Sequence, residues 1–289
     1  MGTIIYPILL FLNNNDKRRI IMERLQGVSN TLFIPLSARV FASKKFPEYF
    51  YDEKALSMEK YIPGDSIQKK SSEYSFMASV ARYYNMDNMA RSFISKHQTC
   101  NIVYLGAGLE TAYYRLNLNN QSVLFYEVDL PEVIDIRRSI LGEHENEMLV
   151  GGDMFDMSWI HTINKSFPSL LIVSGVFQYF TEDKVRQFIT NIRAHLKDVE
   201  LIFDATNETG IKYANSYVNK TGNANALMHF YVNDGLDFAR KTDTVLIEER
   251  VFFTDARKIL AKKLGLYTRI AMRVVDSKKR AIIVHLKIN

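Results

Sequence analysis

The residues with the most evident chemistry are two glycines and two acids that lie about 20 positions apart. Gly106 and Gly108 follow a β-prone apolar run, and glycines there let the backbone turn sharply and approach a ligand closely. Glu127 and Asp129 end the next apolar run. In doubly wound folds a carboxylate at about this interval bonds the ribose hydroxyls of a nucleotide. The spacing predicts a site for an adenosine-containing ligand, with one of the two acids facing the ribose.

The same turn lacks the features of a pyrophosphate site. A dinucleotide fingerprint has glycine or alanine three residues after its second glycine, where this chain has Thr111. Glu110 also occupies the place where a phosphate would meet the helix N-terminus. An adenosine ligand without phosphates fits better, and S-adenosylmethionine is the common one. A plain strand-to-helix turn is the alternative interpretation of the two glycines.

Composition and charge are those of an ordinary globular protein. The chain has 289 residues, of which 47% are hydrophobic and 24% charged. Its net charge of +5 permits an anionic substrate, and the basic residues are scattered, so we expect no nucleic-acid partner. Cys100 is the single cysteine, which excludes an intramolecular disulfide and favours the cytoplasm. The apolar run 4–12 is shorter than the ~20 residues of a membrane span, so we expect a helix packed on the domain surface and no membrane association.

Strands and helices alternate from Cys100 onward, after a helical N-terminal part. Apolar residues at three- and four-residue spacings predict helices within residues 20–25 and 77–94. Further helices are expected at residues 131–141 and from the N-cap Thr181 to residue 196. The expected strands are residues 103–105, 123–129, 148–150, 170–173 and 200–204. This alternation predicts parallel strands joined by right-handed crossovers.

The C-terminal segment breaks the alternation. A helix at residues 255–264 stops at Gly265, and two β-prone runs, 267–275 and 280–288, flank a turn. That pattern predicts a β-hairpin whose last strand is antiparallel to its neighbour. The predicted fold is therefore α/β, with a Rossmann-like class I methyltransferase sheet, parallel except for the C-terminal antiparallel hairpin, and a helical N-terminal extension. We expect a helical cap at residues 1–95 and a cofactor-binding core at residues 96–289, with a substrate-facing insertion around residues 206–250.

Six segments in consistent order cover roughly residues 20–205. They read TLFIPLSARVFASKKFPEYFYDEKA, ARYYNMDNMARSFI, VYLGAGLETAYYRL, FYEVDLPEVIDIRR, GGDMFDMSWI and SGVFQYFTEDKV. Together they resemble the leucine carboxyl methyltransferase superfamily, and more closely its branch of polyketide-synthesis O-methyltransferases.

By this resemblance, Arg82 and Arg39 would hold the carboxylate of S-adenosylmethionine, because a forked guanidinium pairs well with a carboxylate. A salt bridge to a nearby acid is the alternative role for each arginine. The backbone of Gly106, Ala107 and Gly108 would pack against the methionine part of the cofactor.

The resemblance also assigns the two ends of the adenosine. Asp129 would bind the ribose, with Glu127 as the other candidate. Asp153 and Met154 would receive the adenine, the acid at its exocyclic amine and the apolar side chain against its ring. A helix-capping role for Asp153 ahead of Trp159 is the alternative.

Two positions depart from the family's pattern. Relatives carry Asp-Thr-Arg after the glycine turn and Glu-Gly-Val after the fourth strand, where this chain has Glu110-Thr111-Ala112 and Ser174-Gly175-Val176. Ser174 thus replaces a carboxylate expected near the cofactor, and Gln178 is a candidate to compensate for it. Tyr179 resembles a tyrosine near the methyl group in relatives, which implies that it orients the acceptor; packing in the core is the alternative.

The implied activity is S-adenosylmethionine-dependent O-methylation of a small molecule, aromatic or polyketide-like, at a carboxylate or a phenol. A carboxylate is ionised at neutral pH and needs no general base, whereas a phenol needs one, with His161 and His229 as loose candidates. The histidine and cysteine spacings indicate no metal site. Two alternatives stay open: a non-catalytic S-adenosylmethionine-binding protein, motivated by Ser174, and an RNA methyltransferase, motivated by the basic charge.

The sequence leaves the acceptor and the oligomeric state open. An aromatic group in the C-terminal part favours a small hydrophobic acid, although these side chains also suit a core: Phe230, Tyr231, Phe238, Phe252 and Phe253.

Overall fold

A computed structural model describes residues 32–62, 71–116, 122–220 and 227–289. The predicted helices at residues 4–12 and 20–25 lie outside these ranges. No helix of the described ranges is both long enough and apolar enough to cross a membrane.

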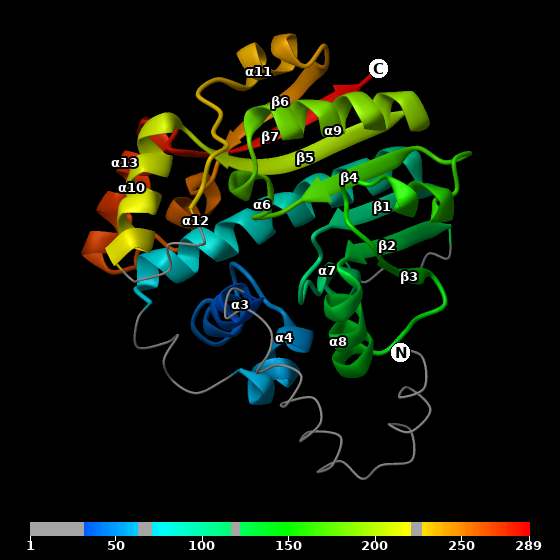
Figure 1. The fold of residues 1–289 in the computed structure, drawn as a ribbon. Coiled ribbons are helices and arrows are strands. Elements are labelled where there is room, and N and C mark those ends of the chain that lie inside the picture. The colour runs from blue at the N-terminus through cyan, green and yellow to red at the C-terminus, as the bar shows by residue number, and fades with distance from the viewer. Residues whose placement is uncertain (1–31, 63–70, 117–121, 221–226) are drawn as a thin grey trace.

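A seven-stranded sheet in the order β3-β2-β1-β4-β5-β7-β6 forms the centre of the molecule (Figure 1). Its five strands from β3 to β5 are parallel, so their carboxyl ends share one edge. β7 runs antiparallel between β5 and β6. The strands are β1 (Cys100–Leu105), β2 (Val123–Asp129), β3 (Glu147–Gly151), β4 (Ser169–Val173), β5 (Val199–Thr206), β6 (Val245–Val251) and β7 (Ala281–Ile288).

Helices cover both faces of this sheet. Alternate residues of a strand point to opposite faces, so Ile102 and Tyr104 of β1 pack in one apolar cluster and Val103 and Leu105 in another. The first cluster includes side chains of α3 (Phe33–Lys45), α6 (Glu73–His97), α12 (Thr254–Ile259) and α13 (Leu266–Ser277). The second includes side chains of η3 (Ser158–Thr162), η4 (Phe177–Tyr179), α9 (Glu182–His195) and α11 (Gly235–Lys241). The other helices are α4 (Glu53–Met58), η2 (Glu59–Tyr61), α7 (Ala112–Arg115), α8 (Pro131–Leu141) and α10 (Glu208–Lys220).

The predicted elements between residues 77 and 206 are confirmed, with shifts at their ends. Thr181 caps α9 by accepting a hydrogen bond from the Lys184 amide, and α8 starts at Pro131. α6 starts four residues earlier than predicted, behind a capping box formed by Ser72 and Ser75. Side chains of α6 and β1 pack in one apolar cluster, across the predicted boundary between a cap at residues 1–95 and a core at residues 96–289. The division into these two domains stays a prediction.

The predicted C-terminal hairpin is wrong in its first strand. β7 is antiparallel, as predicted, but the run 267–275 lies within α13, and the second antiparallel partner is β6, which the sequence had not revealed. Thr268, Met272 and Asp276 are the buried residues of α13, at helical four-residue spacing. Asp276 accepts hydrogen bonds from the Phe253 amide and from Arg257. These contacts override the β propensity of the segment. The helix predicted at 255–264 ends early, at Ile259.

Candidate functional site

One cavity of about 1050 Å³ opens along the carboxyl edge of the parallel strands. Its first half is bordered by the turn after β1, the end of β2 and the loop after β3. Its second half, which we call the acceptor chamber, is bordered by α6, the end of β5, α10, α13 and the start of β7. The acceptor chamber includes Tyr74, Ala78, Tyr213, Met228, Phe252, Phe253, Val275 and Ala281. Ligand cavities of enzymes have a similar size, ~300–1,000 Å³.

The turn after β1 requires its two glycines. Gly106 and Gly108 have φ angles of +70° and +51°, which side chains other than glycine's rarely allow. A Cβ atom on Gly106 would lie 2.5 Å from Cγ2 of Val176, in the loop after β4. The turn therefore brings its backbone, including Ala107, to the cavity wall and packs closely on the neighbouring loop.

Asp129 lines the cavity and Glu127 does not. Two residues that are two positions apart share a face of the strand, so they differ in depth along it. At the strand end, Asp129 accepts hydrogen bonds from the amides of Gly108 (2.7 Å) and Leu130 (2.7 Å). Burial raises its pKa, and these two donors oppose the rise. Its position suits the ribose.

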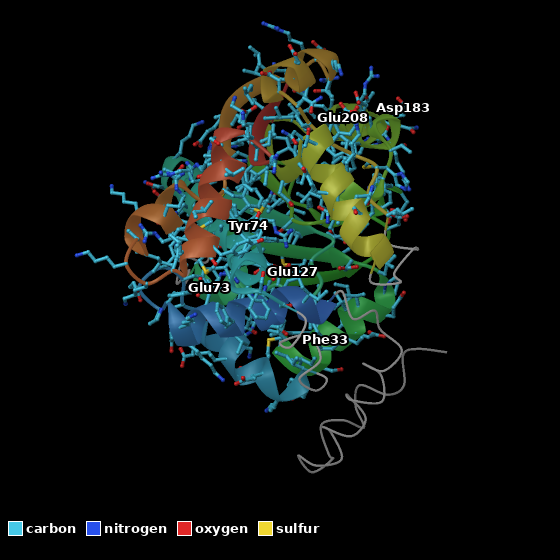
Figure 2. All side chains as sticks on the ribbon, turned by 90° about the vertical axis from the view of Figure 1, so that its left-hand side faces the viewer. Phe33, Glu73, Tyr74, Glu127, Asp183 and Glu208 are labelled. Atoms are coloured by element: carbon cyan, nitrogen blue, oxygen red, sulfur yellow. The ribbon has the colours of Figure 1, made fainter. Side chains whose placement is uncertain are left out.

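Glu127 lies deeper, in the interior of the molecule (Figure 2). Its Oε1 atom is 3.1 Å from Nη2 of Arg137, an α8 residue with no exposed surface. Burial raises the pKa of Glu127 well above its usual range although Arg137 acts against it. Asp129, and not Glu127, is therefore the candidate ribose ligand.

Arg137 binds the backbone of the glycine turn, a role that the sequence did not indicate. Its Nη1 donates to the carbonyl oxygens of Gly108 (3.0 Å) and Glu110 (2.8 Å). The side chain thus links the acid of β2 to the backbone that borders the cavity.

A buried ionic cluster holds the other end of the turn. Arg115 pairs with Asp87 through two hydrogen bonds of 2.7 and 2.9 Å, and its Nη1 lies 2.7 Å from Glu110 and 3.1 Å from Asp52. Arg39 contacts the same two acids at 3.4 Å. Burial raises the pKa of Glu110, but the guanidinium groups of Arg115 and Arg39 outweigh it and bring this pKa to about 2.

Arg39 lines the cavity, and its guanidinium is held by Asp52, Glu110 and the backbone, although its Nε makes no hydrogen bond within the described residues. Its Nη2 donates to the Leu109 carbonyl at 2.6 Å, and the side chain is 1% exposed. The alternative of a salt bridge, considered from the sequence, describes this arginine well. Its contacts fix the glycine turn to α3.

Arg82 also has an internal partner. Its Nη1 lies 3.3 Å from Oδ2 of Asp204, at the carboxyl end of β5, and Oδ1 of that acid accepts from the Gly175 amide at 2.6 Å. The positive charge is stabilised: burial lowers the pKa of Arg82, and Asp204 and Tyr83 together raise it by more. Nε of Arg82 is buried without a hydrogen-bond partner among the described residues. Arg82 therefore keeps a free donor beside the cavity that it lines.

Asp153 and Met154 line the cavity next to the end of β3. Met154 is 6% exposed, and Asp153 accepts from the Phe155 amide at 2.9 Å. A buried thioether and a carboxylate that sits at the surface of the chain fit the face and the amine edge of a purine. The helix ahead of Trp159, η3, has no side-chain cap, so the helix-capping alternative for Asp153 is wrong, and its contact with the adenine stays a prediction.

Ser174 and Tyr179 lie on the loop after β4, and both line the cavity. The hydroxyl of Ser174 is buried without a hydrogen-bond partner in the described ranges. Tyr179 is 38% exposed, which is against packing in the core. Gln178 lines the cavity too, whereas His161 and His229 are exposed and do not.

The aromatic group that suggested a hydrophobic acceptor divides into two sets. Phe252 and Phe253 line the acceptor chamber, where Tyr74 packs against Phe253 with ring centres 5.8 Å apart (Tyr74 is labelled in Figure 2). Phe230 and Phe238 pack on each other in the core of the opposite face. Tyr231 does not line the cavity.

Several polar residues of the cavity were missed from the sequence. Asp204 could have been predicted, because ligands of open α/β sheets bind at the carboxyl ends of the strands and this acid lies at the end of β5. The hydroxyls of Ser79, Tyr104 and Thr206 are buried without partners in the described part of the chain, and Arg280 precedes β7. No local pattern marks these four, because only the topology brings them together. The described residues hold no cluster of acids, histidines or cysteines that suits a metal ion.

The sequence of the chain, compared with known families, matches the family described as leucine carboxyl methyltransferase over residues 25–193. The chain belongs to this family. That membership confirms the family predicted from the six segments and S-adenosylmethionine as the cofactor.

Two relatives are similar to this chain over most of its length. The tetracenomycin polyketide synthesis O-methyltransferase TcmP of Streptomyces glaucescens is 23% identical over 191 residues, 66% of this chain and 70% of the relative. The S-adenosyl-L-methionine-dependent methyltransferase dpfgK of Gibberella zeae is 24% identical over 247 residues, 79% of this chain and 83% of the relative. The first of them confirms the predicted similarity to the polyketide-synthesis branch.

Two solved structures confirm the predicted fold class and show the fold alone. A Thermobifida fusca protein with a provisional methyltransferase assignment has a TM-score of 0.57 at 15% identity, covering 87% of this chain and 94% of its own. A DUF574 family protein of Streptomyces avermitilis has a TM-score of 0.56 at 12% identity, and the match covers 88% of this chain and 97% of that protein's chain.

Proposed function

We propose that this protein transfers a methyl group from S-adenosylmethionine to the carboxylate oxygen of a small, largely apolar acid. One observation carries the proposal: a single cavity joins the glycine turn and Asp129 to the acceptor chamber. A donor in the first half and an acceptor in the second would therefore meet without crossing solvent. The name of the TcmP relative supports oxygen as the acceptor atom.

The residues of the first half fit the cofactor. Asp129 would accept from the ribose hydroxyls, and Met154 would lie against the adenine with Asp153 near its amine. The unpartnered Nε of Arg82 would take the cofactor's carboxylate, since guanidinium–carboxylate hydrogen bonds are strong. The unpartnered hydroxyl of Ser174 would bond the methionine part, where relatives carry a carboxylate.

When bound, S-adenosylmethionine supplies an electrophilic methyl group, whose bond electrons return to sulfur as an acceptor oxygen forms the new bond. The protein's contribution is mainly to hold the acceptor oxygen in line, and such positioning can supply much of a rate enhancement. Tyr179 borders the cavity and would orient the acceptor by a hydrogen bond from its hydroxyl. A carboxylate enters this step without losing a proton, so none of the described side chains has to act as a base.

The test is a methylation assay with radiolabelled donor on matched aromatic acids and phenols. With a carboxylate as nucleophile, the rate stays nearly constant from about pH 6 to 9, because the acceptor is ionised throughout. A rate that rises across this interval, or activity on phenols only, would contradict carboxyl methylation. Tyr179→Phe is expected to reduce kcat/KM for the acceptor while cofactor affinity is unchanged.

A second candidate is a protein that binds the cofactor without catalysis, and Ser174 in place of the family's acid favours it. Its signature would be tight cofactor binding with no methylation of any acceptor. We propose the cytoplasm as the location, because the only cysteine, Cys100, is a buried free thiol.

A further inference from the structure

Three arginines line the cavity, and they differ in how their charge is balanced. Arg39 contacts Asp52 and Glu110, and Arg82 contacts Asp204. Arg280 is the exception: within the residues that the structure describes, it has no carboxylate partner. A guanidinium that lines a pocket without a counter-charge suits an anion, because it holds its charge at every physiological pH.

The topology fixes where Arg280 lies. Thr206, the last residue of β5, pairs with Ala281, the first residue of β7, so Arg280 stands just beyond the carboxyl end of β5. The Asn207 amide donates to its carbonyl oxygen at 3.3 Å, which ties this backbone to the start of α10. Its guanidinium carbon lies 5.1 Å from the ring centre of Tyr213 in α10. The side chain therefore belongs to the acceptor chamber and not to the turn that receives the cofactor.

The surroundings of Arg280 describe the rest of the ligand. Phe252, Phe253, Val275 and Ala281 give this chamber an apolar wall. The buried hydroxyls of Ser79 and Thr206 line it too and have no partners among the described residues. Burial raises the pKa of Tyr74, and the charge of Arg280 partly offsets this rise, so the charge reaches the chamber wall. The tyrosines of the chamber, Tyr74 and Tyr213, add further hydroxyls, and the one carboxylate at the end of β5, Asp204, is already paired with Arg82. An apolar wall with hydroxyls and one cation that no carboxylate of the described residues balances matches a hydrophobic molecule that carries a single acidic group.

We propose that Arg280 binds the acidic group of the methyl acceptor and thereby selects hydrophobic carboxylic acids over alcohols and phenols of the same shape. The inference rests on the proposed function for the identity of the occupant. It adds a consequence for turnover if the methylated group is the one that Arg280 holds. A methyl ester has no charge, so the product loses this contact and leaves more readily than the substrate would.

The experiment measures binding and methylation separately. Isothermal titration of the S-adenosylhomocysteine complex uses 2-naphthoic, anthracene-2-carboxylic and decanoic acids, each beside its matched alcohol or phenol. We expect at least one acid to bind about tenfold or more tightly than its neutral match. Arg280→Gln should weaken the binding of that acid by roughly 10- to 100-fold, the range for a hydrogen bond to a charged group, and leave the binding of the neutral match unchanged. Arg280→Lys should retain part of the preference.

Arg273→Gln is the matched control, because Arg273 is an exposed arginine of α13 that does not line the cavity. It should change neither the acid nor S-adenosylhomocysteine binding. The proposal is overturned if the natural chain binds no acid more tightly than its neutral match, or if the Arg280→Gln variant keeps this preference. It is also overturned if Arg280→Gln weakens the binding of S-adenosylhomocysteine and not that of the acid. Acid binding through Arg280 without formation of methyl ester would refute the proposed reaction and leave the anion site standing, so the two failures are distinguishable.

Discussion

Arg82→Ala tests whether an arginine at the cavity serves the fold, the cofactor or both. If Arg82 were only a cofactor ligand, the change in the stability of the unliganded protein would be small. The structure predicts otherwise. Asp204 is 8% exposed and Arg82 14%, and removal of Arg82 leaves the acid with only the Gly175 amide. Breaking a buried pair from one side costs ~3–5 kcal/mol, and the residual donor places this one near about 3 kcal/mol.

For a chain of 289 residues, this loss corresponds to a decrease in melting temperature of about 6 °C. Thermal unfolding without ligand measures it. Isothermal titration with S-adenosylmethionine measures the second effect, a decrease in affinity of roughly 10- to 100-fold through the lost charge-assisted hydrogen bond. Adding Asp204→Asn to Arg82→Ala removes the unpaired charge and keeps an acceptor for Gly175. The double variant should recover about half of the stability and none of the cofactor affinity.

The matched control is Arg257→Ala. Arg257 lies 3.0 Å from Asp276, which is 6% exposed and likewise keeps a backbone donor, from Phe253, but neither residue lines the cavity. Arg257 is 33% exposed, so its removal should cost less stability and leave cofactor affinity unchanged. Unaltered unfolding of Arg82→Ala would refute the structural role. Restored cofactor affinity in the double variant would show that Arg82 acts only by neutralising Asp204.

Two further predictions concern the glycine turn. Gly106→Ala should weaken cofactor binding at least tenfold by titration, and adding Val176→Ala should restore binding only in part, because it removes the 2.5 Å contact but not the positive φ. The control is Gly142→Ala, at φ +85° with no atom within 4 Å of the added Cβ, which should lower stability without a change in cofactor binding. Unaltered cofactor binding by Gly106→Ala would contradict this account. Because the pKa of Glu110 is lowered to about 2, its stabilising effect is complete above the unfolded-state pKa of about 4.5 and is lost as the pH falls toward 2. In urea unfolding, the free energy of unfolding of Glu110→Gln should therefore change less with pH in this interval than that of the natural chain, by up to about 3 kcal/mol. Parallel pH profiles of the two proteins would refute this prediction.

The sequence by itself determined the elements whose signals are local. Thr181 marks the start of α9 because a hydroxyl can satisfy a free amide there, and Pro131 marks α8 because its fixed φ suits a first turn. Gly106 and Gly108 identify the turn because few other residues adopt its φ angles. Each of these inferences depends on residues within a few positions of one another.

Tertiary structure decided the questions whose answers involve distant partners. The sequence could not choose between Glu127 and Asp129, since both occupy one face of β2 and only the position of α8 buries the first. The partner of Arg82 is 122 residues away, on a strand that the crossovers bring beside it. Arg280 shows the same limit: its local sequence resembles a strand entrance, and only the pairing of β7 with β5 places it in a cavity. Charge balance in a site is a property of the neighbours that the fold selects, so it appears only when the chain is folded.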